Sequence, residues 1–106
     1  MLRTYRRRSG LSQRELGLIL GYQDAGQVSR HERSETVPPL DVALAYEVIF
    51  CAPVAALFPK MLAEVEREIA ESLSALEQRL GEQSGRGRGA ERTAQKLIWL
   101  MQRRTQ

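Results

Sequence analysis

Apolar residues recur at spacings of three and four along most of this chain, which is the period of an amphipathic helix. Leu2 and Tyr5 mark the core face of a first helix over residues 2–9. The further helices expected before Pro59 have these apolar positions: Leu16, Ile19 and Leu20 over residues 12–20; Val28 and His31 over 24–33; Leu40, Ala43, Leu44, Val48, Ile49 and Phe50 over 40–50; and Val54, Leu57 and Phe58 after Pro53. The pattern predicts an all-α chain in which residues 1–59 form one small domain.

Capping residues mark the limits of the second and third helices. Glu15 follows Ser12 by three residues, the spacing of a capping box, in which the hydroxyl accepts from the third amide and the carboxylate reaches back. Gly21 can end this helix in the left-handed conformation, and the carboxylate of Asp24 can cap the next one. The third helix has an apolar back and a polar front, and it follows the second after a glycine turn. This arrangement is typical of a helix-turn-helix.

After Pro59 the sequence changes to one long amphipathic pattern. Residues 60–82 carry a narrow apolar seam, which predicts a helix on the order of 30 Å long at ~1.5 Å per residue. Residues 84–89, SGRGRG, predict a flexible basic linker. Residues 90–104 predict a last helix with Ala94, Leu97, Ile98 and Met101 on one face, broadened by Trp99 and Leu100. The seam residues expected to meet a partner are Leu62, Val65, Ile69, Leu73, Leu76, Leu80, Leu97, Trp99 and Met101.

Residues 60–106 therefore form a helical extension for dimerisation or partner binding. The long helix exceeds what the first domain can cover, so part of its seam needs another partner. Two interpretations stay open: the helix pairs with a second copy of the chain, or it folds back within one chain on its own domain and on the last helix. A basic amphipathic last helix would also suit a membrane surface or a calmodulin-like partner, but nothing else in the chain supports that.

Charge is unevenly distributed along the chain. The formal net charge is +3 and the sequence pI is about 9.5. Residues 1–33 carry a net +4, residues 34–59 and 60–83 carry −3 each, and residues 84–106 carry +5. A basic helix-turn-helix suits an anionic partner.

Candidate chemistry beyond this is sparse. Cys51 is the only cysteine, so no intrachain disulfide can form; this fits a reducing cytoplasm, and we expect a small, buried or half-buried side chain. His31 is the only histidine, and no metal-ligand spacing or cofactor motif is present. The basic start MLRTYRRRSG lacks the apolar run of a signal peptide, and no stretch approaches the ~20 apolar residues that span a bilayer. Without a nucleophile-base pair, paired carboxylates or a phosphate-binding loop, we expect a cytoplasmic protein that is no enzyme and binds no membrane.

The first half of the chain resembles the XRE family of phage-repressor and Cro-type helix-turn-helix regulators. The matching residues are LSQREL in the second helix, Gly21 at the turn, QVSRHER in the third helix, VPPL in the loop and PVAALF in a fifth helix. The resemblance covers residues 2–59 and implies a five-helix, lambda-repressor-like DNA-binding domain. It also implies that Arg6 pairs with Glu32 and fastens the first helix to the third.

The resemblance implies how such a domain would contact DNA. Its base-reading positions fall on Ala25, Gly26 and Arg30, with Gln27 and Ser29 as supporting candidates, and the Arg30 fork can bond guanine N7 and O6 together. Ala25 and Gly26 depart from the polar pair often found there, which limits direct readout and leaves room for shape readout. Phosphate contacts are expected from Ser12 and Gln13 at the start of the second helix, and from Arg14, Arg33, Ser34 and Thr36 on the same surface.

The sequence thus favours a regulator that binds double-stranded DNA as a homodimer, reads a palindromic operator through its third helix and acts as a repressor. The alternative is a protein-interaction module, an antitoxin or an antirepressor, whose residues 60–106 bind a partner protein.

Overall fold

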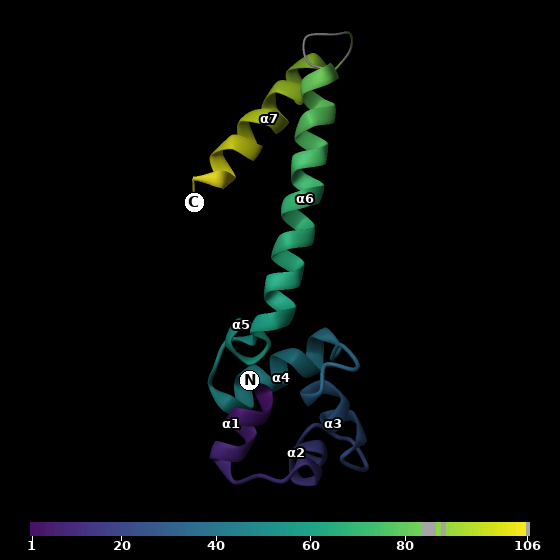
Figure 1. Ribbon diagram of the computed structural model, residues 1–106, viewed down its shortest axis with the longest axis vertical. Coiled ribbons are helices and arrows are strands. Elements are labelled where there is room, and N and C mark those ends of the chain that lie inside the picture. The colour runs from purple at the N-terminus through teal and green to yellow at the C-terminus, as the bar shows by residue number, and fades with distance from the viewer. Residues whose placement is uncertain (84–86, 88, 106) are drawn as a thin grey trace. The chain divides into compact units, whose positions relative to one another are not determined.

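The computed structural model describes residues 1–83, 87 and 89–105 of the 106-residue chain. Every regular element in these residues is an α-helix, so the all-α class is confirmed. The helices, labelled in Figure 1, are α1 (Leu2–Ser9), α2 (Gln13–Ile19), α3 (Gly26–Glu32), α4 (Leu40–Phe50), α5 (Val54–Leu57), α6 (Pro59–Gln83) and α7 (Ala90–Arg104). Most of the expected linker at 84–89 lies outside the described residues.

The chain divides into two compact units, Met1–Leu62 and Ala63–Gln106. The first unit is built around one core to which each of its five short helices contributes a fully buried side chain. At about 1.5–3 kcal/mol for each fully buried apolar side chain, these residues hold the five helices together. They are Leu2, Leu16, Val28, Tyr46 and Leu57.

Both halves of the capping box are present at the start of α2. The Ser12 hydroxyl accepts from the Glu15 amide at 3.0 Å, and the Glu15 carboxylate accepts from the Ser12 amide at 2.9 Å. Hydrogen bonding of the Glu15 carboxyl to the Ser12 backbone amide, and secondly to the Ser12 side chain, lowers the pKa of Glu15. Gly21 follows α2 with φ +88°, the left-handed conformation expected of it.

The α2–α3 turn depends on a second glycine. Gly17 is buried, and a Cβ atom at this position would lie 2.6 Å from the Asp24 carbonyl oxygen. Asp24 lies two residues before α3 begins, and its carboxylate accepts from the Gly26 amide at 2.8 Å, while Ala25 and not Asp24 occupies the cap position. Close approach at Gly17 therefore sets how the turn enters α3.

The expected core face of α4 was wrong in part. Leu40, Leu44 and Val48 are exposed, whereas Ala43 is buried as expected, together with Tyr46, which was not expected there. Val42, Ile49 and Phe50 pack against the core beside them. α4 carries apolar side chains of its own on nearly every side, so their spacing in the sequence did not identify which side faces the core.

Two further expectations in the first unit were wrong. Ile19 is exposed, so the core face of α2 consists of Leu16, Gly17 and partly Leu20. Cys51 is exposed rather than buried, because it ends α4 in the left-handed conformation with φ +50°.

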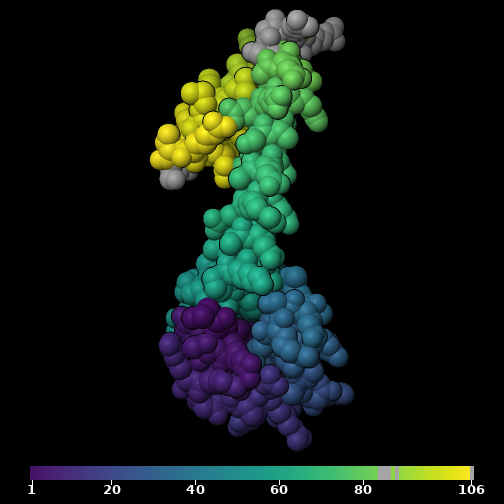
Figure 2. All heavy atoms as spheres, in the orientation of Figure 1, coloured from purple at the N-terminus to yellow at the C-terminus, as the bar shows by residue number. Residues whose placement is uncertain are grey.

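The second unit is a helical hairpin of α7 and the part of α6 that follows Leu62. Leu80 and Leu100 are buried where the two helices pack, and the guanidinium of Arg104 pairs with the Glu77 carboxylate. Figure 2 shows α7 against the later part of α6, on the face in view. Leu73 and Leu97 are half-buried, whereas these seam residues are exposed: Leu62, Val65, Ile69 and Leu76.

The expected inner face of α7 was wrong in part. Leu100, which was expected only to broaden that face, is buried, together with half-buried Leu97. Ala94, Ile98 and Met101 are exposed, and so is Trp99. The hairpin therefore retains apolar surface on both helices that its own packing does not cover.

Candidate nucleic-acid interface

Helix α3 packs against the rest of the first unit through its inner face. Val28 and His31 are buried, and His31 Nδ1 lies 2.8 Å from the Tyr46 hydroxyl on α4. Burial lowers the pKa of His31, and it raises the pKa of Tyr46, as do nearby Tyr22 and Glu32. The imidazole is consequently neutral near neutral pH. The contact between His31 and Tyr46 fixes the rotation of α3 about its own axis.

A second anchor joins α3 to α1 and α2. The Glu32 carboxylate accepts from Arg6 Nε at 2.5 Å, from Arg6 Nη2 at 3.2 Å and from Gln13 Nε2 at 3.1 Å. Arg6 also donates through Nη1 to the Leu11 carbonyl at 3.0 Å. The side chains of Arg6 and Glu32 are only 11% and 2% exposed, so this pair, which the resemblance implied, is shielded from solvent.

Gln13 has a structural contact in addition to its expected role. It was expected to contact a phosphate, but one of its two amide hydrogens binds Glu32. The amide nitrogen still carries a second hydrogen, which can serve an external acceptor.

The outward face of α3 carries Arg30, with Gln27 exposed beside it. A Cβ atom on Gly26 would lie 3.4 Å from Arg30 Nη1 and 3.0 Å from the Asp24 carboxylate. The Arg30 side chain therefore lies back along the helix over its first turn, as a residue four positions ahead can. Gly26 offers no group that reads a base, and it provides the space that the guanidinium occupies.

Asp24 was not among the expected site residues. Its carboxylate and the Arg30 guanidinium approach the same point above Gly26. The four-residue separation of Gly26 and Arg30 could have suggested the contact from sequence, whereas the position of Asp24 depends on the α2–α3 turn.

A shallow groove lies beside α3. Its volume is about 320 Å³, and its lining comes from three helices: Arg3, Gln13, Ser29, Glu32 and Arg33. Ser29 was expected to read bases. It lines this groove together with Gln13 and Arg33, which were expected to contact phosphates. Arg3 was missed, because only folding brings α1 next to the ends of α2 and α3.

The remaining expected phosphate contacts lie on the surface. Arg14, Ser34 and Thr36 are exposed, and Ser34 takes the left-handed conformation with φ +58° just after α3. Arg33 forms an ion pair with Glu35 at 3.0 Å, but both side chains are about half exposed. Of the seven arginines in residues 1–33, only Arg6 is not exposed, so the surface of these helices is basic.

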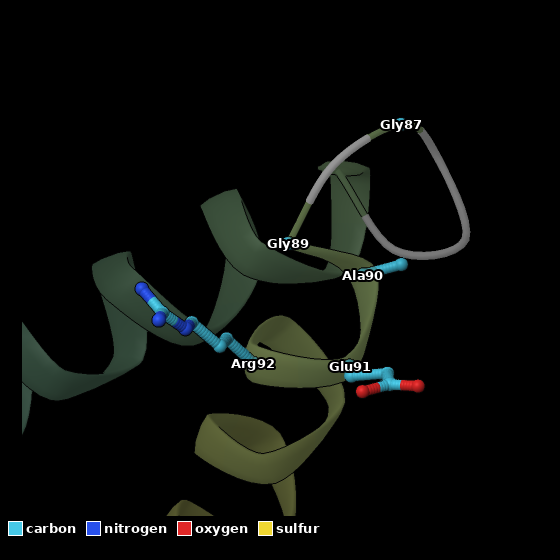
Figure 3. A pocket seen from close by; sticks show the side chains of 5 residues that line it. All are labelled: Gly87, Gly89, Ala90, Glu91 and Arg92. Atoms are coloured by element: carbon cyan, nitrogen blue, oxygen red, sulfur yellow. The ribbon is translucent and has the colours of Figure 1, made fainter.

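A depression at the start of α7 is lined by Gly87, Gly89, Ala90, Glu91 and Arg92, whose two charged side chains point in different directions (Figure 3). Within the described part of the chain, no three His, Cys, Asp or Glu residues are grouped to hold a metal ion. None of the described helices has both the length and the apolar character needed to cross a membrane.

Comparisons with known proteins gave no assignment: no family model matches the chain, and searches of curated proteins and of solved structures found no significant match.

Proposed function

We propose that this chain is a sequence-specific DNA-binding regulator of the repressor type, and that α1–α5 are its lambda-repressor-like reading domain. The observation that carries the proposal is the mounting of α3. Its back is buried through Val28 and His31, Glu32 ties it to α1 and α2, and its outward face carries an exposed arginine. An α-helix presented in this way fits the major groove of B-DNA.

In this proposal Arg30 reads guanine, and Gln27 supports it. A bidentate contact of an arginine with guanine contributes ~1–3 kcal/mol of discrimination against other bases. The groove residues Arg3, Gln13, Ser29 and Arg33 contact the phosphate backbone beside the read bases, together with Ser12, Arg14, Ser34 and Thr36. Such contacts set affinity and salt dependence and carry no sequence preference.

One domain with so few reading side chains discriminates weakly, so we propose that two copies bind a palindrome. Half-site centres would then lie about one helical turn, ~34 Å, apart. Apolar surface for the pairing is provided by the exposed seam residues of α6, among them Val65 and Ile69. A regulator of this kind acts in the compartment that holds the DNA, which we propose is the cytoplasm.

The proposal is tested by selecting bound duplexes from a random pool, first with the natural chain and then with Arg30→Ala. The natural chain should return a symmetric motif, and Arg30→Ala should lose one base preference per half-site while keeping weak, salt-sensitive binding. Arg67→Ala is the matched control, because Arg67 is an exposed arginine on α6. The absence of any motif with the natural chain would contradict the proposed function.

The exposed apolar faces of the hairpin also favour a second candidate, a protein-interaction module that acts as an antitoxin or antirepressor. Its hairpin would bind a different protein in place of a second copy. Purification from the native cell distinguishes the two: a stoichiometric foreign subunit together with no DNA motif would favour the module.

A further inference from the structure

Helix α4 leaves an apolar face of the first unit uncovered. Leu40, Leu44 and Val48 follow one another by four residues, so they share one side of the helix, and they are 74%, 47% and 77% exposed. The opposite side of α4 is already packed in the core. A helix that is apolar all round is normally covered on all sides, so this face has the character of a contact surface.

Acidic residues border this α4 face. Asp41 and Glu47 lie three residues before and after Leu44, one toward each side of the apolar row. The whole segment 34–59 contains three acidic residues and no lysine or arginine. Two α4 faces placed against each other would oppose like charges, which costs free energy. The α4 face is therefore complementary to a partner surface that has an apolar centre and basic residues beside it.

Such a surface exists on α7. Arg92, Lys96, Trp99 and Arg103 follow one another by four, three and four residues, so they form one stripe along the helix. All four are exposed, and Trp99 is 55% exposed. The Arg103 guanidinium lies 5.9 Å from the centre of the Trp99 ring. The side of α7 that packs in the hairpin carries Leu97 and Leu100, so this packing leaves Lys96 and Trp99 open. Arg103 is exposed too, although it also lines a groove with residues of α6.

Both surfaces place a large apolar side chain between two charged ones. Lys96 and Arg103 lie three residues before and four residues after Trp99, and Asp41 and Glu47 lie three residues before and after Leu44. Tryptophan and arginine are also the side chains enriched at the centres of protein interfaces.

We propose that the α7 stripe of a second copy of this chain covers the α4 face. Trp99 of that copy lies against Leu44, its Lys96 beside Asp41 and its Arg103 beside Glu47. Because each chain carries both surfaces, two chains can form the contact twice and close as a symmetric dimer. This inference does not depend on DNA binding, and it adds the first unit to the surfaces that associate.

The test measures the dimer dissociation constant of the full chain by sedimentation equilibrium, and the emission of Trp99, the only tryptophan, over the same concentrations. The Trp99 emission should shift to shorter wavelength as dimers form. Leu44→Asp should weaken dimerisation by about tenfold or more, as loss of a central interface residue does, and should remove the shift. Leu18→Asp is the matched control, since Leu18 is a similarly exposed leucine of the same unit.

A charge exchange makes the contact specific. Asp41→Arg and Lys96→Glu should each weaken dimerisation, and the double variant should recover most of the loss, because it restores opposite charges. Additive losses in the double variant, or a dimer that tolerates Leu44→Asp as well as Leu18→Asp, would overturn the proposal. A chain that stays monomeric at all concentrations would also overturn it, whether Trp99 is covered within that monomer or not. No DNA is present, so failure here is distinct from failure of the proposed regulator.

Discussion

Replacing Glu32 by alanine should destabilise the first unit far more than loss of an exposed ion pair does. The Glu32 side chain is 2% exposed, and its carboxylate accepts hydrogen bonds from Arg6 and Gln13. Without it, the Arg6 guanidinium stays largely shielded from solvent with only the Leu11 carbonyl as a partner. Removing one member of a buried pair costs about 3–5 kcal/mol. Because Arg6 retains 11% exposure, we expect the lower end, about 3 kcal/mol.

The expected change is large enough for a simple assay. For a domain of 60–100 residues, ~1 kcal/mol corresponds to ~4–8 °C in the melting temperature, so about 3 kcal/mol predicts a fall of about 12 °C or more. Far-ultraviolet circular dichroism during heating measures this, because the first unit consists of helices.

The chain contains its own control. Glu35→Ala removes the ion pair with Arg33, in which both side chains are about half exposed, and should change stability by about 0.5 kcal/mol or less. A melting temperature of Glu32→Ala equal to that of Glu35→Ala would refute the reasoning. The double change Arg6→Met with Glu32→Leu provides a further check, because apolar replacement of a buried ion pair is often neutral or stabilising.

Three further predictions concern the histidine and the special backbone positions. Burial lowers the pKa of His31 below its ordinary 6.5, so below about pH 6.5 the unfolded chain binds more protons than the folded chain. The free energy of unfolding should therefore fall as the pH is lowered toward 5. His31→Gln should remove this pH dependence, as measured by denaturant unfolding across that range. Cys51→Gly should raise the melting temperature slightly, because glycine accepts φ +50° without strain, and an unchanged or lower value would contradict this. Gly17→Ala should destabilise the chain by at least about 1 kcal/mol, since its Cβ would meet the Asp24 carbonyl. Gly81→Ala, with open space around it in α6, should stabilise the chain by about 0.5–1 kcal/mol. Equal effects of the two variants in thermal melts would count against the close approach at Gly17.

Local signals predicted the elements around α3 well. The Ser12–Glu15 capping box and the left-handed Gly21 follow from hydrogen bonds and backbone preferences within a few residues. Val28 and His31 were correctly placed on the inner face of α3, because that helix is polar elsewhere and its apolar side is unambiguous. The all-α class rests on the same kind of periodic evidence.

Periodicity failed where a helix is apolar on more than one side. In α4, Leu40 and Val48 fit the spacing of a core face as well as Ala43 and Tyr46 do, and only packing against the other helices decides between them. In α7, Ile98 is exposed although it fits the same stripe as half-buried Leu97. The choice of inner face is a property of the assembled unit.

The candidate interface shows the same division. Arg30 follows from its position on α3, whereas Arg3 joins the groove only because α1 folds next to α2 and α3. The contact of Gln13 with Glu32 was missed for the same reason, since 19 residues separate the two in sequence.

The shared carboxylate of Glu32 also limits how this protein can be controlled. It holds Arg6 and Gln13 at once, so α3 cannot tilt or slide alone without leaving a shielded charge unbalanced. Three helices must therefore move as a rigid body. In the dimeric regulator proposed above, a change in DNA affinity would therefore come from the spacing between the two copies and not from a movement of α3 alone.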